Sequence, residues 1–166
     1  ALPFKVLRDI EVTPSFSPAK TKCIATLAYG HVMKLALQYQ QRFWDGPQSL
    51  GQRVFTDTLL RRLYHFSIDQ PGPRGILMSF TSGADAETLG RMGEGERLRT
   101  ALQETTKVWP EAPRHFEGGA VKYWNEDPWI RGSYSFEGVG QARDYLQIAA
   151  ASEGRVHFAG EHTSVH

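Results

Sequence analysis

The chain has 166 residues, of which 40% are hydrophobic and 22% charged, and its nine phenylalanines and four tryptophans are ample for a buried core. A formal net charge of +1, without any cluster of lysine or arginine, gives no electrostatic case for binding nucleic acid. No stretch approaches the roughly 20 apolar residues that a membrane-spanning helix needs. The single cysteine, Cys23, excludes an internal disulfide and a cysteine-based zinc site. We therefore expect a globular protein of one domain or two partial ones.

Local patterns in the first part of the chain predict three elements. The loose alternation of Leu2–Glu11 indicates a strand. Ser17 followed by Pro18 is a good helix N-cap with proline at the first helical position, which predicts a helix to about Leu27. From Val32 to Phe43 the apolar residues recur with period two and predict a strand. One face of that strand would hold Met33, Leu35, Leu37 and Tyr39, and the other Val32, Lys34, Ala36 and Gln38.

The remainder alternates turn signals with strand and helix signals. Gly46-Pro47 and Gly51 indicate a loop, and Pro71–Gly75 a turn before an apolar strand. The elements expected after that turn are a strand at Ile76–Phe80, helices at Asp85–Arg91 and Gly95–Trp109, a strand at Ala120–Trp124, a helix at Gln141–Ala151 and a strand at Val156–Ala159. Strands connected partly by turns and partly by helices indicate a mixed α/β chain.

The end of the chain, Arg155–Ser164, contains the most informative motif. A strand that runs into Gly160-Glu161 matches the place where ligands bind in open α/β sheets, just past the carboxyl end of a strand. Gly160 would let a cofactor approach the backbone, and Glu161 could accept a hydrogen bond from a ribose or ribityl group. Thr163 suits a helix N-cap or an anion. An ordinary strand-to-helix turn would have the same sequence, so both interpretations stay open.

Two further features could carry chemistry. Four aromatic residues lie within Tyr123–Ser135, where they could form the walls of a slot for a planar ligand or a buried aromatic corner. Lys34 could lie on the solvated face of its strand, or it could be buried, where desolvation would lower its pKa. The six histidines have no metal-ligand spacing, and the sequence has no nucleophile elbow, so we expect no metal site.

Taken in chain order, several of these motifs resemble one family. Tyr29-Gly30-x-x-x-Lys34, Trp124-x-x-Asp-Pro-Trp129-x-x-Gly-Ser-Tyr-Ser135 and Phe158-Ala-Gly-Glu-His-Thr163 resemble the C-terminal part of the flavin-containing amine oxidases. This family includes monoamine and polyamine oxidases, lysine-specific histone demethylases and L-amino acid oxidases. The resemblance covers the whole chain and is closest to the L-amino acid oxidases, in particular to the bacterial L-glutamate oxidases, whose precursor is cut into fragments that stay together. The abrupt start and end of the sequence fit such a fragment.

The resemblance implies FAD as cofactor and a role for each matching residue. Gly160, Glu161 and Thr163 would contact the FAD chain, and Trp124 would line the flavin neighbourhood. Lys34 would reach flavin N5 through a water and assist reoxidation by dioxygen. Tyr134 and Tyr64 would face the substrate.

It also implies an architecture and partners. Residues 1–27 and 132–166 would belong to the FAD-binding domain, and residues 28–131 to the substrate-binding domain. Other fragments of the same precursor would supply the dinucleotide-binding motif that this chain lacks, and the assembled protomer would form a dimer outside the cell.

The implied reaction is oxidative deamination of an amino acid to a 2-oxo acid, ammonia and hydrogen peroxide, with dioxygen as the electron acceptor. Two alternatives stay open: a polyamine oxidase or histone-demethylase-like amine oxidase, and a non-catalytic assembly subunit.

Overall fold

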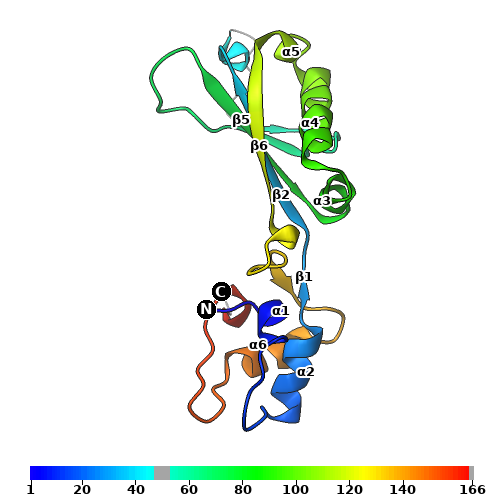
Figure 1. Cartoon of the computed structure of the whole chain (residues 1–166), viewed down its shortest axis with the longest axis vertical. Helices are drawn as coiled ribbons and strands as arrows, with labels where there is room; N and C mark the ends of the chain where they lie inside the picture. Colours follow the sequence, from blue (N-terminus) through cyan, green and yellow to red (C-terminus); the bar gives the residue numbers. More distant parts are fainter. Residues whose placement is uncertain (47–52, 165–166) are drawn as a thin grey trace. The chain divides into compact units, whose positions relative to one another are not determined.

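The computed structural model describes residues 1–46 and 53–164, so the loop predicted at Pro47 and Gly51 lies outside the described residues. The chain forms two compact units, which are coloured along the sequence in Figure 1. Unit 1 combines Ala1–His31 with Trp124–His166, and unit 2 is Val32–Tyr123. The units therefore divide at Val32 and Tyr123, whereas the sequence placed domain boundaries at 28 and 131. Their assignment to FAD binding and substrate binding stays a prediction.

Unit 2 is built on a five-stranded antiparallel sheet with the strand order β3-β4-β5-β2-β6. The strands are β2 (Val32–Tyr39), β3 (Arg53–Phe55), β4 (Arg62–His65), β5 (Gly75–Ser82) and β6 (Phe116–Tyr123). The two long central strands pair along their whole length, from Val32 opposite Ser82 to Tyr39 opposite Gly75. This pairing fixes which side chains of β2 and β5 share a face, because residues directly opposite each other point the same way.

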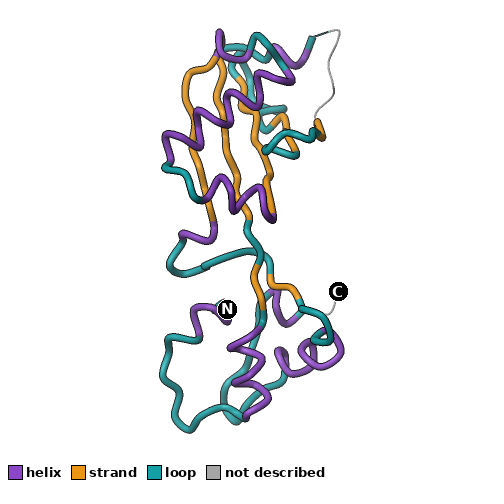
Figure 2. The backbone as a smooth tube through the Cα atoms, turned by 90° about the vertical axis from the view of Figure 1, so that its right-hand side faces the viewer, coloured by secondary structure: helices purple, strands orange, loops and turns teal. Residues whose placement is uncertain are grey.

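Helices cover one face of this sheet, as Figures 1 and 2 show. They are α3 (Gly83–Gly90) and α4 (Glu94–Val108), which contact β2, β5 and β6, and the short α5 (Ala112–His115), which follows α4; η1 (Phe43–Asp45) is a single 3-10 turn. The core beneath them contains Met33, Leu35, Leu37 and Tyr39, all essentially inaccessible to solvent. The predicted alternation is therefore confirmed as far as Tyr39, where β2 ends four residues before the expected Phe43, and the two helices predicted later in the chain are confirmed as α3 and α4.

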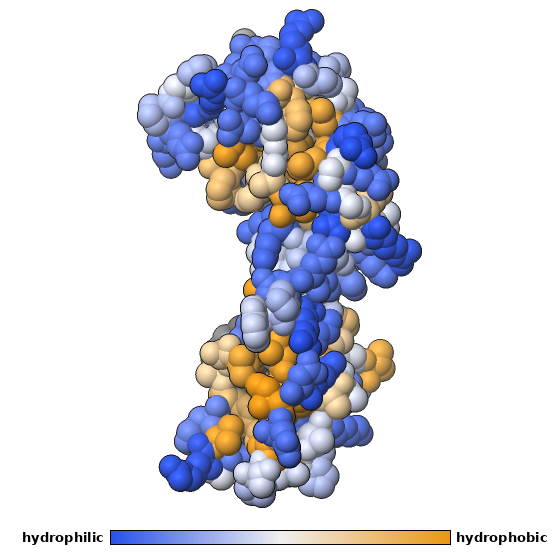
Figure 3. Space-filling view, in the orientation of Figure 1, coloured by the Kyte–Doolittle hydropathy of each residue, from blue (hydrophilic) through white to orange (hydrophobic). Residues whose placement is uncertain are grey.

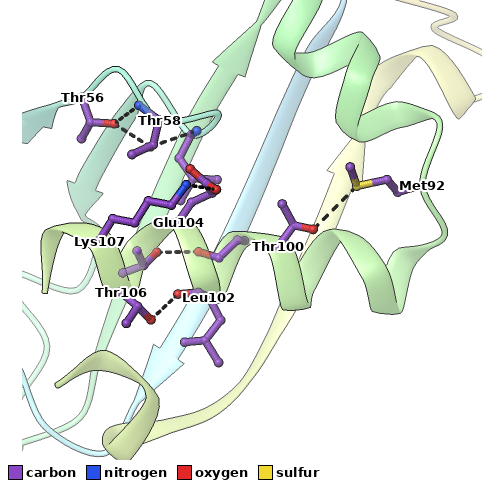
Figure 4. A network of polar contacts seen from close by, with 11 residues as sticks. Thr56, Thr58, Met92, Thr100, Leu102, Glu104, Thr106 and Lys107 are labelled. Atoms are coloured by element: carbon purple, nitrogen blue, oxygen red, sulfur yellow. Dashed lines mark hydrogen bonds and ion pairs between the residues drawn. The ribbon is translucent and has the colours of Figure 1, made fainter. Parts of the chain in front are cut away.

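Side-chain contacts along α4 fix it locally (Figure 4). The Thr100 hydroxyl lies 3.7 Å from the sulfur of Met92, and the Thr106 hydroxyl donates to a backbone carbonyl one turn earlier, 2.7 Å away. Lys107 Nζ lies 2.6 Å from Glu104 Oε1, one turn apart on the same helix. α4 lies on the same face of the sheet as α3, and no described helix of unit 2 covers the opposite face.

The described residues of unit 1 form three α-helices, two 3-10 turns and one short β-ladder. The elements are α1 (Phe4–Leu7), α2 (Pro18–Thr26), β1 (Ala28–Tyr29), η2 (Trp124–Glu126), β7 (Ser135–Phe136), α6 (Ala142–Ala150) and η3 (Glu161–Thr163). β1 and β7 pair antiparallel, and a small core of Phe4, Cys23, Ile24, Leu27, Tyr29, Tyr145 and Ala149 lies between the helices. Cys23 is a buried thiol of this core, and burial raises its pKa.

The N-terminus of α2 is tied to the end of α6 by polar contacts. Ser17 caps α2 by accepting from the Lys20 backbone N–H, as predicted, and its own N–H and hydroxyl donate to the Glu153 carboxylate at 2.9 and 2.6 Å. These two hydrogen bonds lower the pKa of Glu153. Lys20 Nζ is fully buried and donates to the carbonyls of Ala149 (3.0 Å) and Ala151 (2.7 Å), where a cation complements the C-terminus of α6.

Two predicted strands of unit 1 are wrong. Leu2–Glu11 contains the helix α1 instead, because Pro3 caps a turn whose Val6 and Leu7 N–H groups donate to the Pro3 carbonyl. Val156–Ala159 forms only one isolated bridge, from Val156 to Glu153, and Val156 is 41% exposed. A strand needs a neighbouring strand for its backbone hydrogen bonds, and no described residue offers one to either segment.

Candidate active site

Lys34 lies on the uncovered face of the unit 2 sheet. Its neighbours Met33 and Leu35 point into the core, so the period of two directs Lys34 to the other face, where it is half-buried. Phe80 on β5 and Lys122 on β6 lie directly opposite it. The ammonium lies 5.8 Å from the centroid of the Phe80 ring, within the range of a cation–π contact.

A hollow of about 280 Å³ opens beside Lys34 on this face. We call it the Lys34 hollow; its lining includes Lys34, Arg53, Tyr64, Ile68, Met78 and Phe80. Strand register brings these residues together, since Tyr64 on β4 lies opposite both Arg53 on β3 and Met78 on β5. Two residues that the sequence proposed separately, Lys34 and Tyr64, therefore line one hollow.

The Gly160 turn of unit 1 combines a glycine backbone with a carboxylate. Gly160 has a φ of 139°, which favours glycine, and a Cβ built there would lie 2.9 Å from the His162 ring. The Glu161 carboxylate accepts from the Ser135 N–H (2.8 Å) and the Ser135 hydroxyl (3.0 Å). The Thr163 hydroxyl donates to the Gly160 carbonyl at 2.8 Å, which closes the turn. His162 is buried beneath it, and burial lowers its pKa.

Within this chain, most of the aromatic loop Tyr123–Ser135 is open to solvent. Trp124 begins η2 and is half-buried, whereas Tyr134 is 58% and Trp129 73% exposed. The Tyr134 carbonyl accepts from the Gly30 N–H at 2.8 Å, which fixes the loop beside β1. The buried aromatic corner therefore holds for Tyr123 alone, while Tyr134 and Trp129 present ring faces at the surface.

These residues of unit 1 fit a flavin dinucleotide. The Gly160 backbone carries no side chain, the Glu161 carboxylate can accept from a hydroxyl of the cofactor chain, and Tyr134 offers an apolar ring. The part of the chain that the structure describes contains no group of three or more metal-ligating side chains. No described helix is long and apolar enough to cross a bilayer.

Two contacts of the site could not be predicted from local sequence. Arg53 reaches the Lys34 hollow only through the pairing of β3 with β4, which nothing in its local sequence indicates. Ser135, the partner of Glu161, belongs to the Gly132-Ser-Tyr-Ser135 motif, but the motif does not reveal what the hydroxyl contacts.

Comparison with known proteins identifies the family of the chain. Residues 1–166 match the model of the family "Flavin containing amine oxidoreductase". The flavin-dependent L-tryptophan oxidase RebO of Lentzea aerocolonigenes is 32% identical over 172 residues, covering 98% of this chain and 36% of its own length. The lysine-specific histone demethylase 1B of Mus musculus is 32% identical over 167 residues, covering 95% of this chain and 20% of its own length.

The fold is also similar to a solved oxidase. Wild-type putrescine oxidase bound to putrescine matches with a TM-score of 0.82 at 23% identity, over 96% of this chain and 35% of that chain. This likeness confirms the mixed α/β fold. The chain thus spans about a third or less of the length of these relatives. Family membership confirms FAD as the expected cofactor, and we conclude that the chain belongs to the flavin-containing amine oxidoreductases.

Proposed function

We propose that the chain is part of an FAD-dependent L-amino acid oxidase that acts on L-glutamate. The reaction would consume an amino acid, water and dioxygen and release a 2-oxo acid, ammonia and hydrogen peroxide. The observation that carries the proposal is the meeting of Lys34 and Tyr64 in one hollow on the uncovered sheet face. An L-tryptophan oxidase and an L-amino-acid oxidase of Siganus canaliculatus, 31% identical over 159 residues, are among its relatives and support an amino acid as substrate.

The residues of the Lys34 hollow would position the substrate. FAD supplies the redox chemistry when bound. Tyr64, Met78 and Phe80 give the hollow apolar walls that exclude water and orient the carbon skeleton. Lys34 would act as an orienting cation and stabilise negative charge that develops when dioxygen is reduced. It has no role as a general base in this proposal.

Residues of unit 1 would hold the cofactor. The Gly160 backbone and the Glu161 carboxylate would bind the FAD chain, with Thr163 closing their turn. Trp124 would contribute to the flavin neighbourhood, and the exposed ring of Tyr134 would face the substrate.

We further propose that this chain works only together with other polypeptide segments. It spans about a third of the L-tryptophan oxidase, and its sequence has no Gly-x-Gly-x-x-Gly motif for the FAD pyrophosphate. Apolar residues gather in a patch on each unit in the face that Figure 3 shows, and exposed apolar patches mark interaction surfaces. Other fragments of the same precursor would supply the motif. We also propose that the assembled protomer forms a dimer and that the protein is exported from the cell.

A panel of substrates tests the function. The complex that co-purifies with this chain should be yellow, and a peroxide assay should report turnover of L-glutamate above other L-amino acids. Sedimentation and cell fractionation of the same complex test the dimer and the export. A complex without flavin absorbance would instead support a non-catalytic assembly subunit.

A polyamine oxidase is the second candidate, since putrescine oxidase shares the fold and histone demethylases are among the relatives. Its substrates are cations, and they would meet two cations, Lys34 and Arg53, in the Lys34 hollow. Like charges repel in such a partly enclosed site. Turnover of putrescine or spermine above that of every amino acid would establish this alternative.

A further inference from the structure

The loop 127–134 is attached to helix α1 of unit 1 by contacts that run in both directions. From α1, Lys5 Nζ donates to the Arg131 carbonyl at 2.9 Å. From the loop, the Arg131 guanidinium donates to the Lys5 carbonyl at 3.3 Å and forms an ion pair with Asp9, which follows α1. Each of the two basic side chains therefore binds the backbone of the other residue. We call Lys5, Asp9 and Arg131 the α1 clamp.

Arg131 has a backbone conformation that residues with a side chain rarely adopt. Its φ is 60°, in the left-handed region, where the approach of Cβ to a carbonyl oxygen costs free energy. Such a conformation persists only where the surrounding contacts impose it. Within the loop, the Arg131 N–H donates to the Asp127 carbonyl at 2.9 Å and its Nε to the Pro128 carbonyl at 3.0 Å. These contacts and the α1 clamp together offset the cost.

The residues that follow the clamp are fixed beside β1. Gly132 is buried, and a Cβ built there would lie 3.0 Å from the Gly30 carbonyl oxygen. The Ser133 N–H donates to the same carbonyl at 3.1 Å, and the Gly30 N–H donates to the Tyr134 carbonyl at 2.8 Å. The backbone at Tyr134 is therefore held on the side of β1 and, three residues earlier, on the side of α1, while the Tyr134 ring is 58% exposed.

Helix α1 is itself anchored in unit 1. The Phe4 N–H donates to the Tyr29 hydroxyl at 2.9 Å, and Phe4 is fully buried in the core. At the other end of the helix, the Arg8 guanidinium donates to the carbonyls of Ile24 at 2.8 Å and Leu27 at 2.9 Å. A loop that is bonded to α1 is therefore connected through it to α2 and β1.

We propose that Arg131 and Lys5 are positioning residues that hold the Tyr134 ring in place for the substrate. Packing does little to orient a ring that is more than half exposed, so its placement depends on the backbone that carries it. Hydrogen bonds from charged donors are stronger than those between neutral groups, which suits the α1 clamp to this task. The inference rests on the proposed function, in which Tyr134 faces the substrate, and adds the residues that place it there.

Hydrogen exchange in the assembled protein measures the loop without turnover. Arg131→Gln keeps a Cβ at the same backbone position and removes the guanidinium, and Lys5→Met removes the donor from α1. The hydrogen-bonded amides of Ile130, Arg131 and Ser133 should exchange at least about tenfold faster in either variant, because lost anchors lower the free energy of local opening.

Arg143→Gln is the matched control. Arg143 also lies near a carboxylate, 3.9 Å from Asp144, but its side chain is 94% exposed on α6 and takes no part in the α1 clamp. Exchange of the loop amides in this variant should stay within about twofold of wild type.

Kinetics of the same variants test whether this placement serves the substrate. The KM for L-glutamate should rise at least about fivefold while kcat stays within about twofold, because a wall of the site binds substrate and transition state alike. Arg131→Lys keeps the charge beside Asp9 and should recover part of the loss. In a Tyr134→Leu background, which lacks the ring, Arg131→Gln should change KM by less than about twofold further. A purely structural role would add the same effect in both backgrounds.

The proposal is overturned if Arg131→Gln and Lys5→Met exchange like the Arg143→Gln control, or if they exchange faster and leave KM unchanged. Absence of turnover in wild type is a different result. It removes the proposed function and the role of the clamp in substrate binding, while the exchange rates still report whether the clamp holds the loop. Should Arg131→Gln fail to assemble, Asp9→Asn decides, because the Asp9 side chain is 60% exposed and folding should tolerate the change. Wild-type exchange in Asp9→Asn contradicts the clamp.

Discussion

The carboxylate of Glu161 accepts two hydrogen bonds from Ser135, one from its backbone N–H at 2.8 Å and one from its hydroxyl at 3.0 Å. The contact connects η3 to β7. The turn at Gly160 is therefore hydrogen-bonded to Ser135, the residue directly after Tyr134. Both oxygens of Glu161 keep further lone pairs, which leaves the carboxylate able to accept from a ligand as well.

Glu161→Ala should release FAD from the assembled protein. The variant loses an acceptor for the cofactor and both contacts to Ser135, each hydrogen bond being worth about 0.5–1.5 kcal/mol. Flavin absorbance that separates from the protein on gel filtration is the expected result. Ser135→Ala is the control, because it removes one contact within the protein and leaves the carboxylate in place. If both variants lose flavin equally, Glu161 acts through the loop and not on the cofactor.

Lys34→Met should slow reoxidation of the reduced flavoenzyme at least ~10-fold, which corresponds to about 1.4 kcal/mol of barrier. Reduction of dioxygen builds negative charge that a nearby cation stabilises, whereas substrate binding should change little. Stopped-flow mixing of the reduced variant with oxygenated buffer measures the rate. Lys122→Met removes the lysine opposite Lys34 on β6 and should reoxidise like wild type. A wild-type rate for Lys34→Met would remove Lys34 from the site.

Lys20→Met should destabilise unit 1. The buried ammonium donates to two carbonyls near the end of α6, and their loss should cost about 1–3 kcal/mol. Urea unfolding of the assembled protein, followed by circular dichroism, measures the change. Lys22→Met on the exposed side of the same helix should lie within about 0.5 kcal/mol of wild type. Equal stabilities of the two variants would mean that these hydrogen bonds contribute nothing net.

Glu153 should make the stability of unit 1 depend on pH in the acid range. Hydrogen bonds from Ser17 lower its pKa in the folded chain. A depressed pKa means that its contribution is present above the unfolded value, about 4.3 for glutamate, and is lost as pH falls through the folded value. Glu153→Gln should therefore flatten the fall of Tm with pH below that point. A profile parallel to wild type would show that the contact does not affect folding.

Local signals predicted those elements that depend on few long-range contacts. The Ser17-Pro18 cap correctly predicted α2. The alternation of Met33, Leu35 and Leu37 correctly predicted β2 and its buried face. The strand predictions for Leu2–Glu11 and Val156–Ala159 failed because apolar residues were taken as a signal of a buried strand. In the first segment burial occurs without strand pairing, and in the second only Phe158 is partly buried. Phe4 and Val6 are buried from a helical turn, and Phe158 packs on the core of unit 1 from a loop.

The site was predicted residue by residue but not as a whole. Lys34 and Tyr64 were named separately, and only the register of β4, β5 and β2 shows that they line the same hollow. Register depends on partners far away in sequence, so the sequence had no means of adding Arg53 to them.

The chain enters and leaves unit 2 at neighbouring points. Met33 on β2 lies opposite Tyr123 on β6, and within unit 1 the Asn125 side chain donates to the Gly30 carbonyl at 3.2 Å. Unit 2 is therefore an insertion whose two ends lie next to each other, and the segments of unit 1 that precede and follow it also contact each other. Residues 32–123 could be deleted and His31 joined to Trp124 by a short linker, and the β1–β7 ladder should remain intact. They could also be replaced by a sheet with different lining residues. Under the proposed function, substrate preference and cofactor binding would then change independently, and such an exchange should carry the specificity of the donor sheet with it.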